Sequence, residues 1–344
     1  MNKRRKINIV DTTLRDGSHA VSHSFTTEQV TAVAGALDKV GVEIIELSHG
    51  DGIAGSSVNY GVSKVSELEL LKAAGAVVKN AKLGVLLLPG VGTIEDLEAA
   101  KDCGAKAVRV ATHVTEADIS IQHLKAAAKM GLMPVGFLMM THMASPEKIL
   151  EQAKIFVDAG AAYVNLADSA GYLVPDDVKA RVSLLAEQLP IPVGFHAHNN
   201  LGLAVANALA AVETGATYID VTCRGLGAGA GNAQAEVVAA VLNRLGYNTG
   251  LDLYGYMDVS ENIVEPLMHR PQTINSAALM LGYAGVYSSF LLHTYRAAEK
   301  FCLNPRDILV ELGKRGMVGG QEDMIVDVAF ALSQSKKGSG ITGQ

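Results

Sequence analysis

The sequence predicts a (β/α)8 TIM barrel followed by a helical C-terminal region. Short runs of β-branched and aliphatic residues recur eight times in roughly the first 225 residues, as the strands of one sheet would. Segments with apolar residues at helical spacing separate these runs, and a glycine ends most of these segments. The predicted strands are Ile7–Val10, Ile44–Leu47, Leu83–Leu88, Ala107–Ala111, Pro134–Met139, Tyr163–Leu166, Pro192–Phe195 and Tyr218–Val221.

The segments between the strands indicate a parallel sheet. Thr27–Lys39, Glu95–Cys103 and Pro146–Ala159 have the 3.6-residue apolar spacing of the helices that cross between parallel strands. Eight such units favour a closed barrel over an open doubly wound sheet, which usually has fewer strands and a glycine-rich turn after the first. Glycine tolerates the left-handed position that follows a helix. The glycines expected there are Gly41, Gly104, Gly160 and Gly215.

Three parts of the chain differ in composition. Residues 1–250 are predicted to form the catalytic barrel. The strand pattern stops near Leu251, and residues 251–335 are predicted to be a helical region that covers the barrel and docks a partner. Residues 336–344 are rich in glycine and serine, so we expect a disordered tail. The helices expected in the second part are Asn275–Ser289, Phe290–Cys302, Pro305–Lys314 and Glu322–Ser335.

Composition narrows the classes of function. Hydrophobic residues make up 49% of the chain and charged residues 19%, as in a globular α/β enzyme. The net charge of −6, with one basic run at Lys3–Arg5, argues against a nucleic-acid partner, and no apolar run is long enough to span a membrane. Asp11 interrupts the only early apolar run, so no signal peptide is expected. Cys103, Cys223 and Cys302 lack metal-site or disulfide spacing, which favours a reducing, cytoplasmic compartment. The net charge and the lack of a basic patch favour a small-molecule substrate.

Polar residues gather where the first and seventh predicted strands end. Asp16 lies just beyond the first strand, and His196 and His198 follow the seventh at positions i and i+2, which share one face of a strand. The active site of a parallel barrel lies at these strand ends. Two imidazoles and one carboxylate leave coordination positions open, as in catalytic metal sites. Hydrogen bonding of the two histidines without a metal is the alternative interpretation.

Three segments resemble a known family. Asp11–Gly17, His196–Asn199 and Gly225–Asn232 resemble, in order and spacing, the signatures of the pyruvate-aldolase-like metallolyases. This TIM-barrel family includes 3-hydroxy-3-methylglutaryl-CoA lyase, isopropylmalate synthase and 4-hydroxy-2-oxovalerate aldolase. The aldolase branch carries histidine where the acyl-CoA-using branches generally carry glutamine, and this chain has His19. The lyase's catalytic cysteine after Gly225 is missing, and Cys223 lies upstream.

The resemblance implies retro-aldol cleavage of 4-hydroxy-2-oxovalerate to pyruvate and acetaldehyde, in the meta-cleavage catabolism of aromatic compounds. It implies a divalent metal, Mn²⁺ first with Co²⁺ or Mg²⁺ as alternatives, held by Asp16, His196 and His198. The substrate would chelate the ion through its carboxylate and 2-oxo oxygens, with His196 beside it. A Lewis acid there stabilises the enolate that forms when the C3–C4 bond breaks.

The resemblance also suggests roles for three further residues. Arg15 would stabilise the enolate, with an ion pair to a strand-end carboxylate such as Glu46 as the alternative. His19 would be the general base for the 4-hydroxyl proton, unless it is merely a surface-loop histidine. Tyr287 matches the family's active-site tyrosine, with burial in a core or replacement by Tyr283 as alternatives.

Less specific signals remain at other strand ends. Ser169 is a candidate donor to the substrate carboxylate, although a helix N-cap explains it equally. His49, His113 and His142 also follow strands and are candidates for contacts around the site, without ligand spacing.

The C-terminal helices suggest a partner. The resemblance extends to them through Leu281–Tyr287 and implies a hetero-oligomer with an acylating acetaldehyde dehydrogenase, to which reactive acetaldehyde would be channelled. Two alternatives remain: a Claisen-type synthase that uses an acyl-CoA, and a non-catalytic scaffold that docks a dehydrogenase.

Overall fold

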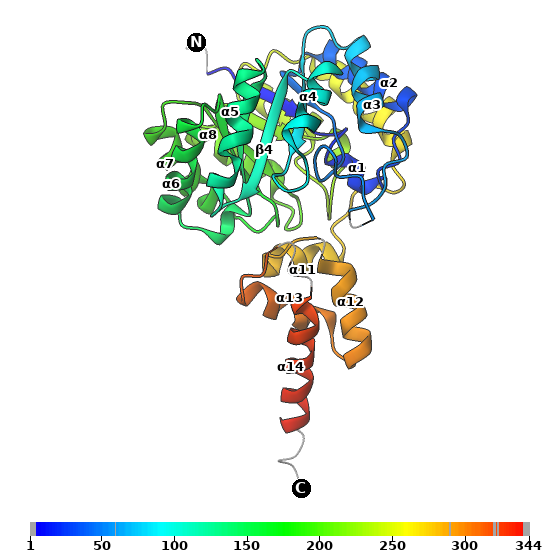
Figure 1. Cartoon of the computed structure of the whole chain (residues 1–344), viewed down its shortest axis with the longest axis vertical. Coiled ribbons are helices and arrows are strands. Elements are labelled where there is room, and N and C mark those ends of the chain that lie inside the picture. The colour runs from blue at the N-terminus through cyan, green and yellow to red at the C-terminus, as the bar shows by residue number, and fades with distance from the viewer. Residues whose placement is uncertain (1–4, 59, 289, 319–320, 322, 340–344) are drawn as a thin grey trace.

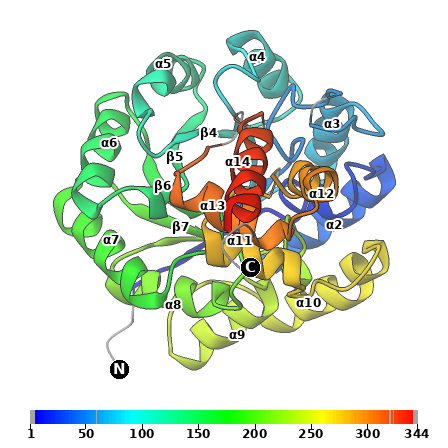
Figure 2. The same cartoon turned by 90° about the horizontal axis from the view of Figure 1, so that it is seen from below.

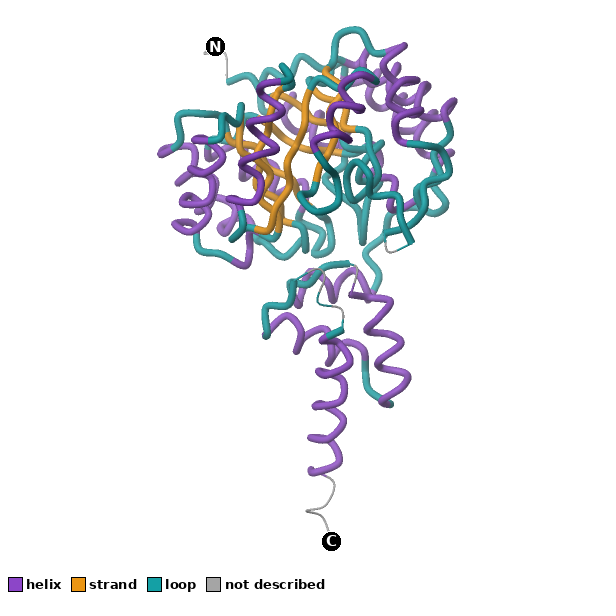
Figure 3. The backbone as a smooth tube through the Cα atoms, viewed as in Figure 1, coloured by secondary structure: helices purple, strands orange, loops and turns teal. Residues whose placement is uncertain are grey.

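The computed structural model describes residues 5–58, 60–288, 290–318, 321 and 323–339. Eight parallel strands close into a barrel in chain order, with the first strand paired to the eighth (Figures 1 and 3). The predicted barrel is therefore confirmed. The strands are β1 Asn8–Asp11, β2 Ile44–Glu46, β3 Lys82–Leu87, β4 Ala107–His113, β5 Met133–Met139, β6 Tyr163–Asp168, β7 Val193–Ala197 and β8 Tyr218–Val221.

Four strands run further than predicted at their carboxyl ends, and one of them, β1, extends by one residue, to Asp11. β4, β6 and β7 each extend by two residues, to His113, Asp168 and Ala197. The apolar pattern stops earlier because each extension includes a polar side chain: Thr112 and His113 in β4, Asp168 in β6 and His196 in β7. The strand ends that the pattern left out therefore lie beside the pocket described below.

Helices surround the barrel, and the predicted crossing helices are confirmed. The glycines expected after four helices have the left-handed φ angles that make glycine favourable there: +94° at Gly41, +109° at Gly104, +90° at Gly160 and +134° at Gly215. The helices are α1 Gly17–Ala20, α2 Thr27–Val40, α3 Glu67–Val77, α4 Ile94–Asp102, α5 Ile121–Lys129, α6 Pro146–Asp158, α7 Pro175–Gln188, α8 Ala204–Thr214, α9 Ala235–Arg244 and α10 Leu253–Asp258.

The interior of the barrel has apolar layers with charged side chains among them. Near the amino ends of the strands, Val10, Ile44, Val135 and Tyr163 form one apolar cluster. Leu86, Ala111, Phe137 and Ala167 form another toward the carboxyl ends. The side chains of Glu46, Arg109 and Asp220 are also fully buried. This charged group lies beneath the candidate site and supports it from inside the barrel.

A separate helical unit covers the barrel mouth, as Figure 2 shows from below. Its buried residues, from Leu281 to Ala329, form a core of their own, whereas Tyr256, Val259 and Val264 pack into the core of the barrel. The last helix reaches Ser339, so residues 336–339 are helical where the sequence predicts a disordered tail. Residues 340–344 lie outside the described residues. The helices are α11 Ser276–Ala284, α12 Phe290–Phe301, α13 Pro305–Lys314 and α14 Met324–Ser339.

Among the described residues, no helix combines the length and apolar character that crossing a membrane requires.

Candidate active site at the barrel mouth

A cavity of about 460 Å³ lies at the carboxyl ends of the strands, between the barrel and the helical unit. Its wall includes apolar side chains such as Leu86, Phe137 and Met139, and residues of the helical unit close one side. All of the site residues predicted from the sequence line this cavity. They are Arg15, Asp16, His19, Ser169, His196, His198 and Tyr287.

Asp16, His196 and His198 converge on one point. The Nε2 atoms of the two histidines are 3.3 Å apart, and Oδ2 of Asp16 lies 3.3 Å from His196 Nε2 and 3.7 Å from His198 Nε2. Donor atoms about 2.0–2.2 Å from a shared ion would lie roughly 3–3.5 Å apart, so the three atoms fit a divalent metal with little movement. The three side chains are at most 10% exposed. The donor set suits an ion with open positions for substrate.

Buried partners hold two of these side chains in place. Nδ1 of His196 lies 2.9 Å from Oδ2 of Asp220, which favours a proton on Nδ1 and leaves the Nε2 lone pair facing Asp16. The backbone N–H of Ala228, in the glycine loop after β8, donates to Oδ1 of Asp16 at 3.1 Å. Gly227 has no room for a side chain, because a Cβ there would lie 2.9 Å from the same oxygen.

The charges around Asp16 keep it ionised. Burial by itself raises the pKa of Asp16, but the Arg15 guanidinium and His198 outweigh it and lower the pKa well below its usual value. Burial is the main cause that lowers the pKa of His198 to about 4, so this imidazole is neutral at neutral pH and keeps a lone pair. An anionic oxygen beside a neutral imidazole is what a cation requires.

Arg15 is fixed by two ion pairs and has one donor left over. Its Nε donates to Glu46 at 2.8 Å and its Nη1 donates to Asp16 at 2.8 Å. Its Nη2 is buried and has no hydrogen-bond partner among the described residues. The ion pair with Glu46, considered above as an alternative role, is therefore present, and it leaves a rigidly placed guanidinium that can still bind an oxygen.

His19 lies in the cavity wall, against Gly50. A Cβ at position 50 would lie 2.7 Å from Cδ2 of His19 and closer still to Cε1 and Nε2, so the imidazole occupies the space that a side chain would need. The ring makes an edge-on contact with His23, with centroids 5.2 Å apart. His19 is thus packed at the cavity wall rather than free on a surface loop.

Of the other candidates, Ser169 and Tyr287 line the cavity, and Tyr283 does not. Ser169 lines the cavity, and its Oγ accepts the backbone N–H of Met140 at 3.1 Å; it caps no helix, because α7 begins at Pro175. Tyr287 lines the cavity and burial raises its pKa, whereas Tyr283 is 65% exposed and is not part of the wall.

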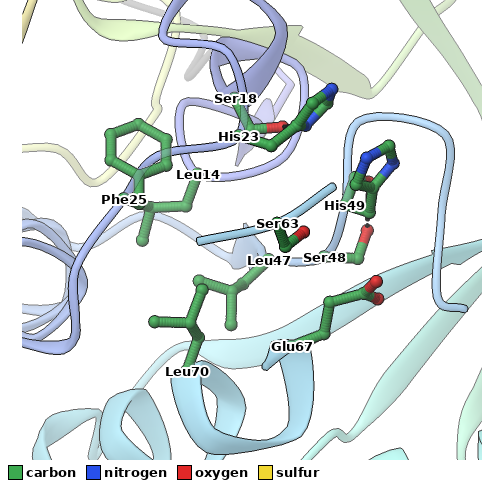
Figure 4. Close-up of a pocket in the computed structure, with 10 residues that line it drawn as sticks. All are labelled: Leu14, Ser18, His23, Phe25, Leu47, Ser48, His49, Ser63, Glu67 and Leu70. Carbon is green, nitrogen blue, oxygen red and sulfur yellow. Dashed lines mark hydrogen bonds between the residues drawn. The ribbon is translucent and has the colours of Figure 1, made fainter. Parts of the chain in front are cut away.

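The three remaining histidines are not in this ligand group. Nε2 of His142 lies 3.1 Å from the carbonyl oxygen of Gly285, which links the barrel to the helical unit. His113 lines the cavity beside Thr115, with its Nδ1 2.9 Å from the hydroxyl. His49 lies in the loop after β2, where its ring is stacked on His23 at 3.7 Å (Figure 4).

Comparison with known proteins identifies the family. Residues 6–263 match the HMGL-like family and residues 272–334 match the DmpG-like communication domain. The chain is 69% identical to 4-hydroxy-2-oxovalerate aldolase of Moorella thermoacetica over 335 residues, which cover 97% of this chain and 99% of that protein. The chain belongs to the 4-hydroxy-2-oxovalerate aldolase family. The aldolase of Carboxydothermus hydrogenoformans is 60% identical, with coverage of 97% and 99%.

Solved structures share the fold of this aldolase chain. The carboxyl transferase domain of Rhizobium etli pyruvate carboxylase, with pyruvate and biocytin, aligns with a TM-score of 0.79 at 18% identity, covering 97% of this chain and 62% of that one. The N-terminal domain of a putative aldolase from Bacteroides vulgatus aligns with a TM-score of 0.71 at 25% identity, covering 83% and 95%. The named relatives favour the aldolase branch over the acyl-CoA synthase considered above. Members of this family are divalent-metal aldolases.

Two charged residues beneath the aldolase site were not among those predicted. Arg109 is fully buried and pairs with Glu46 at 3.2 Å and with Asp220. Glu46 binds Arg15 and Asp220 binds His196, so Arg109 connects the two carboxylates that hold these site residues in place. Burial raises the pKa of Asp220, but Arg109 and His196 outweigh it and lower the pKa. The sequence pattern that could have revealed them is a charged residue between two β-branched neighbours within a strand, as in Val108-Arg109-Val110 and Ile219-Asp220-Val221. Such a charge must have a buried partner.

Substitution of Asp220 by asparagine should weaken metal binding by about 10- to 100-fold, the usual effect of losing the partner of a ligating histidine. An amide no longer fixes the proton of His196 on Nδ1. Isothermal titration of the metal-free chain with Mn²⁺ measures the change. Asp38→Asn is the matched control, since this carboxylate accepts backbone N–H groups between α2 and β3, away from the cavity. Equal affinities of the wild type and Asp220→Asn would contradict the assigned role.

Proposed function

We propose that this chain cleaves 4-hydroxy-2-oxovalerate to pyruvate and acetaldehyde by a retro-aldol reaction that requires a divalent metal ion. The observation that carries the proposal is the convergence of Asp16, His196 and His198 beside the unsatisfied Nη2 of Arg15. The named relatives support the same substrate.

In this mechanism Asp16, His196 and His198 hold the ion, and Mn²⁺ is the expected metal. When bound, the ion supplies a Lewis acid that draws electrons toward the 2-oxo oxygen of the substrate. Nη2 of Arg15 donates a hydrogen bond to the same oxygen as negative charge develops on it. Glu46 and Asp16 keep the guanidinium in place, so little reorganisation is needed during the reaction.

His19 removes the proton of the 4-hydroxyl. As the O–H bond breaks, the C4–O bond becomes the carbonyl of acetaldehyde, and the electron pair of the C3–C4 bond moves into the enolate of pyruvate. A proton then returns to C3. Ser169 and Tyr287 bind the substrate from β6 and from the helical unit, with Ser169 placed to donate to the carboxylate.

A coupled assay tests this function. Pyruvate release from 4-hydroxy-2-oxovalerate is followed in chelator-treated protein, and Mn²⁺, Co²⁺ and Mg²⁺ are added back one at a time. We expect negligible release without metal and the highest rate with Mn²⁺. Full activity in protein shown by elemental analysis to contain no metal would contradict the proposal.

Exchange of Gly50 for alanine should separate the two halves of the reaction. The new Cβ would displace the His19 ring, to which the three nearest described atoms belong, while the backbone and the metal ligands stay in place. Cleavage should fall by about 10- to 100-fold, within the range attributed to a general base. Solvent exchange of the C3 protons of pyruvate should remain, because it involves no 4-hydroxyl. Gly35→Ala, where a Cβ meets only Val77 at 3.6 Å, is the matched control.

We also propose that the chain forms a hetero-oligomer with an acylating acetaldehyde dehydrogenase, which receives the acetaldehyde. Large apolar side chains are exposed on the helical unit, where the communication-domain match lies. They are Leu279, Tyr283, Tyr295, Val326 and Phe330. Co-expression and size-exclusion chromatography should give co-elution that Tyr283→Ser and Phe330→Ser weaken; separate elution of the wild-type chains would refute the complex. Cytoplasmic location stays a prediction.

A further inference from the structure

A second group of potential metal ligands lies beside the cavity. His19 in α1, His23 in the turn that follows, and Asp51 in the loop after β2 each offer one ligand atom, and these atoms all lie within 4.8 Å of one another. This group and the group of Asp16, His196 and His198 have the same donor set, two imidazoles and one carboxylate. His19 and Asp51 also line the catalytic cavity, so an ion that enters the cavity reaches both groups.

The hydrogen bonds of His23 leave one ring nitrogen for a ligand. The hydroxyl of Ser18 donates to the backbone oxygen of Arg15 at 2.6 Å, so Ser18 Oγ accepts from Nδ1 of His23 at 3.0 Å (Figure 4). The proton is therefore on Nδ1, and Nε2 carries the lone pair. The backbone of Tyr60 also accepts a hydrogen bond from this ring, which raises the pKa of His23, and a bound ion would have to replace that hydrogen bond.

His49 supports this group without competing for the ion. Its Nε2 donates to the carbonyl of Gly61 at 3.1 Å, and its Nδ1 accepts the N–H of Asp51 at 3.1 Å, so both nitrogens are in use. Its ring is stacked on that of His23 and holds the ring in place. Burial, with His19 and His49 nearby, lowers the pKa of His23 to about 3, so the imidazole is neutral and able to coordinate.

Two nitrogens and one oxygen suit Zn²⁺, which accepts imidazole and carboxylate at about 2.0–2.2 Å and fills its fourth position with water. The atoms, which lie within 4.8 Å of one another, need to come to roughly 3.3 Å apart. Asp51, whose side chain is 29% exposed, can supply this movement from its loop. Zn²⁺ lies above Mn²⁺ in the order of affinities for such ligands, so Zn²⁺ fills this group at a lower free concentration than Mn²⁺ would.

We propose that His19, His23 and Asp51 form a second, inhibitory cation site that binds Zn²⁺. The inhibition rests on the proposed function, because a zinc ion that takes the lone pair of His19 removes the base for the 4-hydroxyl proton. The binding itself does not depend on that function. Filling this site stops cleavage while Asp16, His196 and His198 keep their own ion.

The test begins with stoichiometry. The full-length, Mn²⁺-loaded chain is titrated with Zn²⁺ by calorimetry, and electron paramagnetic resonance reports any release of Mn²⁺. We expect one equivalent of Zn²⁺ to bind without Mn²⁺ release, and His23→Asn and Asp51→Asn to lose this equivalent. Asparagine tolerates the φ of +53° at position 23. His113→Asn, in the same cavity wall but outside the group, should keep it.

Activity supplies the second readout. Relative to each variant's own zinc-free rate, Zn²⁺ should inhibit cleavage in the wild type and His113→Asn, and at least about 10-fold more Zn²⁺ should be needed in His23→Asn. Zinc that binds only by releasing Mn²⁺, or an extra equivalent that persists in both His23→Asn and Asp51→Asn, would overturn the site. Failure of the proposed function would appear differently: zinc-free protein would not cleave the substrate, while the stoichiometry would still decide the site.

Discussion

Replacement of His198 by alanine should leave a chain that binds little metal and has no measurable cleavage. The substitution removes one of the three ligand atoms, which lie 3.3–3.7 Å apart. The two ligands that remain cannot hold a divalent ion against water. A metal that polarises a carbonyl lowers the barrier by several kcal/mol, so turnover should fall by about 10³-fold or more when the metal is lost. Elemental analysis and the coupled pyruvate assay measure the two losses separately.

The control for this change is His113→Ala, which removes an imidazole from the same cavity wall but not from the ligand group. Its metal content should equal that of the wild type. A His198→Ala protein with wild-type metal content and turnover would show that the ion is held elsewhere.

Alanine substitutions of Arg15 and His19 should affect different reactions. Cleavage requires that electrons be accepted at the 2-oxo oxygen and that a proton leave the 4-hydroxyl, whereas C3 proton exchange in pyruvate requires only the first. Arg15→Ala should therefore lose both reactions together. His19→Ala should lose about 10²- to 10⁴-fold in cleavage, the usual contribution of a general base, and keep measurable exchange.

Deuterium incorporation into pyruvate, followed by NMR, decides between these roles. Because Arg15→Ala removes the guanidinium that donates to Glu46 at 2.8 Å, Arg15→Lys is the second variant; it keeps the positive charge but not the planar guanidinium. Metal content is measured in every variant. Exchange that is lost in His19→Ala and intact in Arg15→Ala would reverse the assignment.

Most of the barrel could be predicted because its signals are local. The apolar runs of β1 to β8 and the glycines after α2, α4, α6 and α8 report on neighbouring residues only, and each is confirmed. The pairing of His196 with His198 was also a local inference, since residues two apart on a strand share a face. The strand ends were less accurate, because the residues that extend β4, β6 and β7 serve the cavity rather than the apolar pattern.

The contacts between distant segments could not be predicted in this way. Arg109 and Asp220 look like isolated charges in two apolar strands until the closed barrel brings them together. Nothing in the sequence marks Gly50 as important, because its role depends on a distant contact. The His19 ring occupies the space that a side chain at position 50 would need. The proximity of His23 to Asp51 likewise depends on how the turn after α1 meets the loop after β2.

The separate core of the helical unit has a consequence for how the protein loses its fold. Residues from Leu281 to Ala329 bury one another, and the barrel core is complete without them. Two cores that share few buried residues need not unfold in a single cooperative transition. The smaller core has the lower free energy of unfolding and therefore unfolds first. Tyr287 belongs to that smaller body, yet it forms part of the cavity wall. On gentle heating the cavity should therefore lose one side, and turnover with it, while the eight strands still protect their amide protons from solvent exchange.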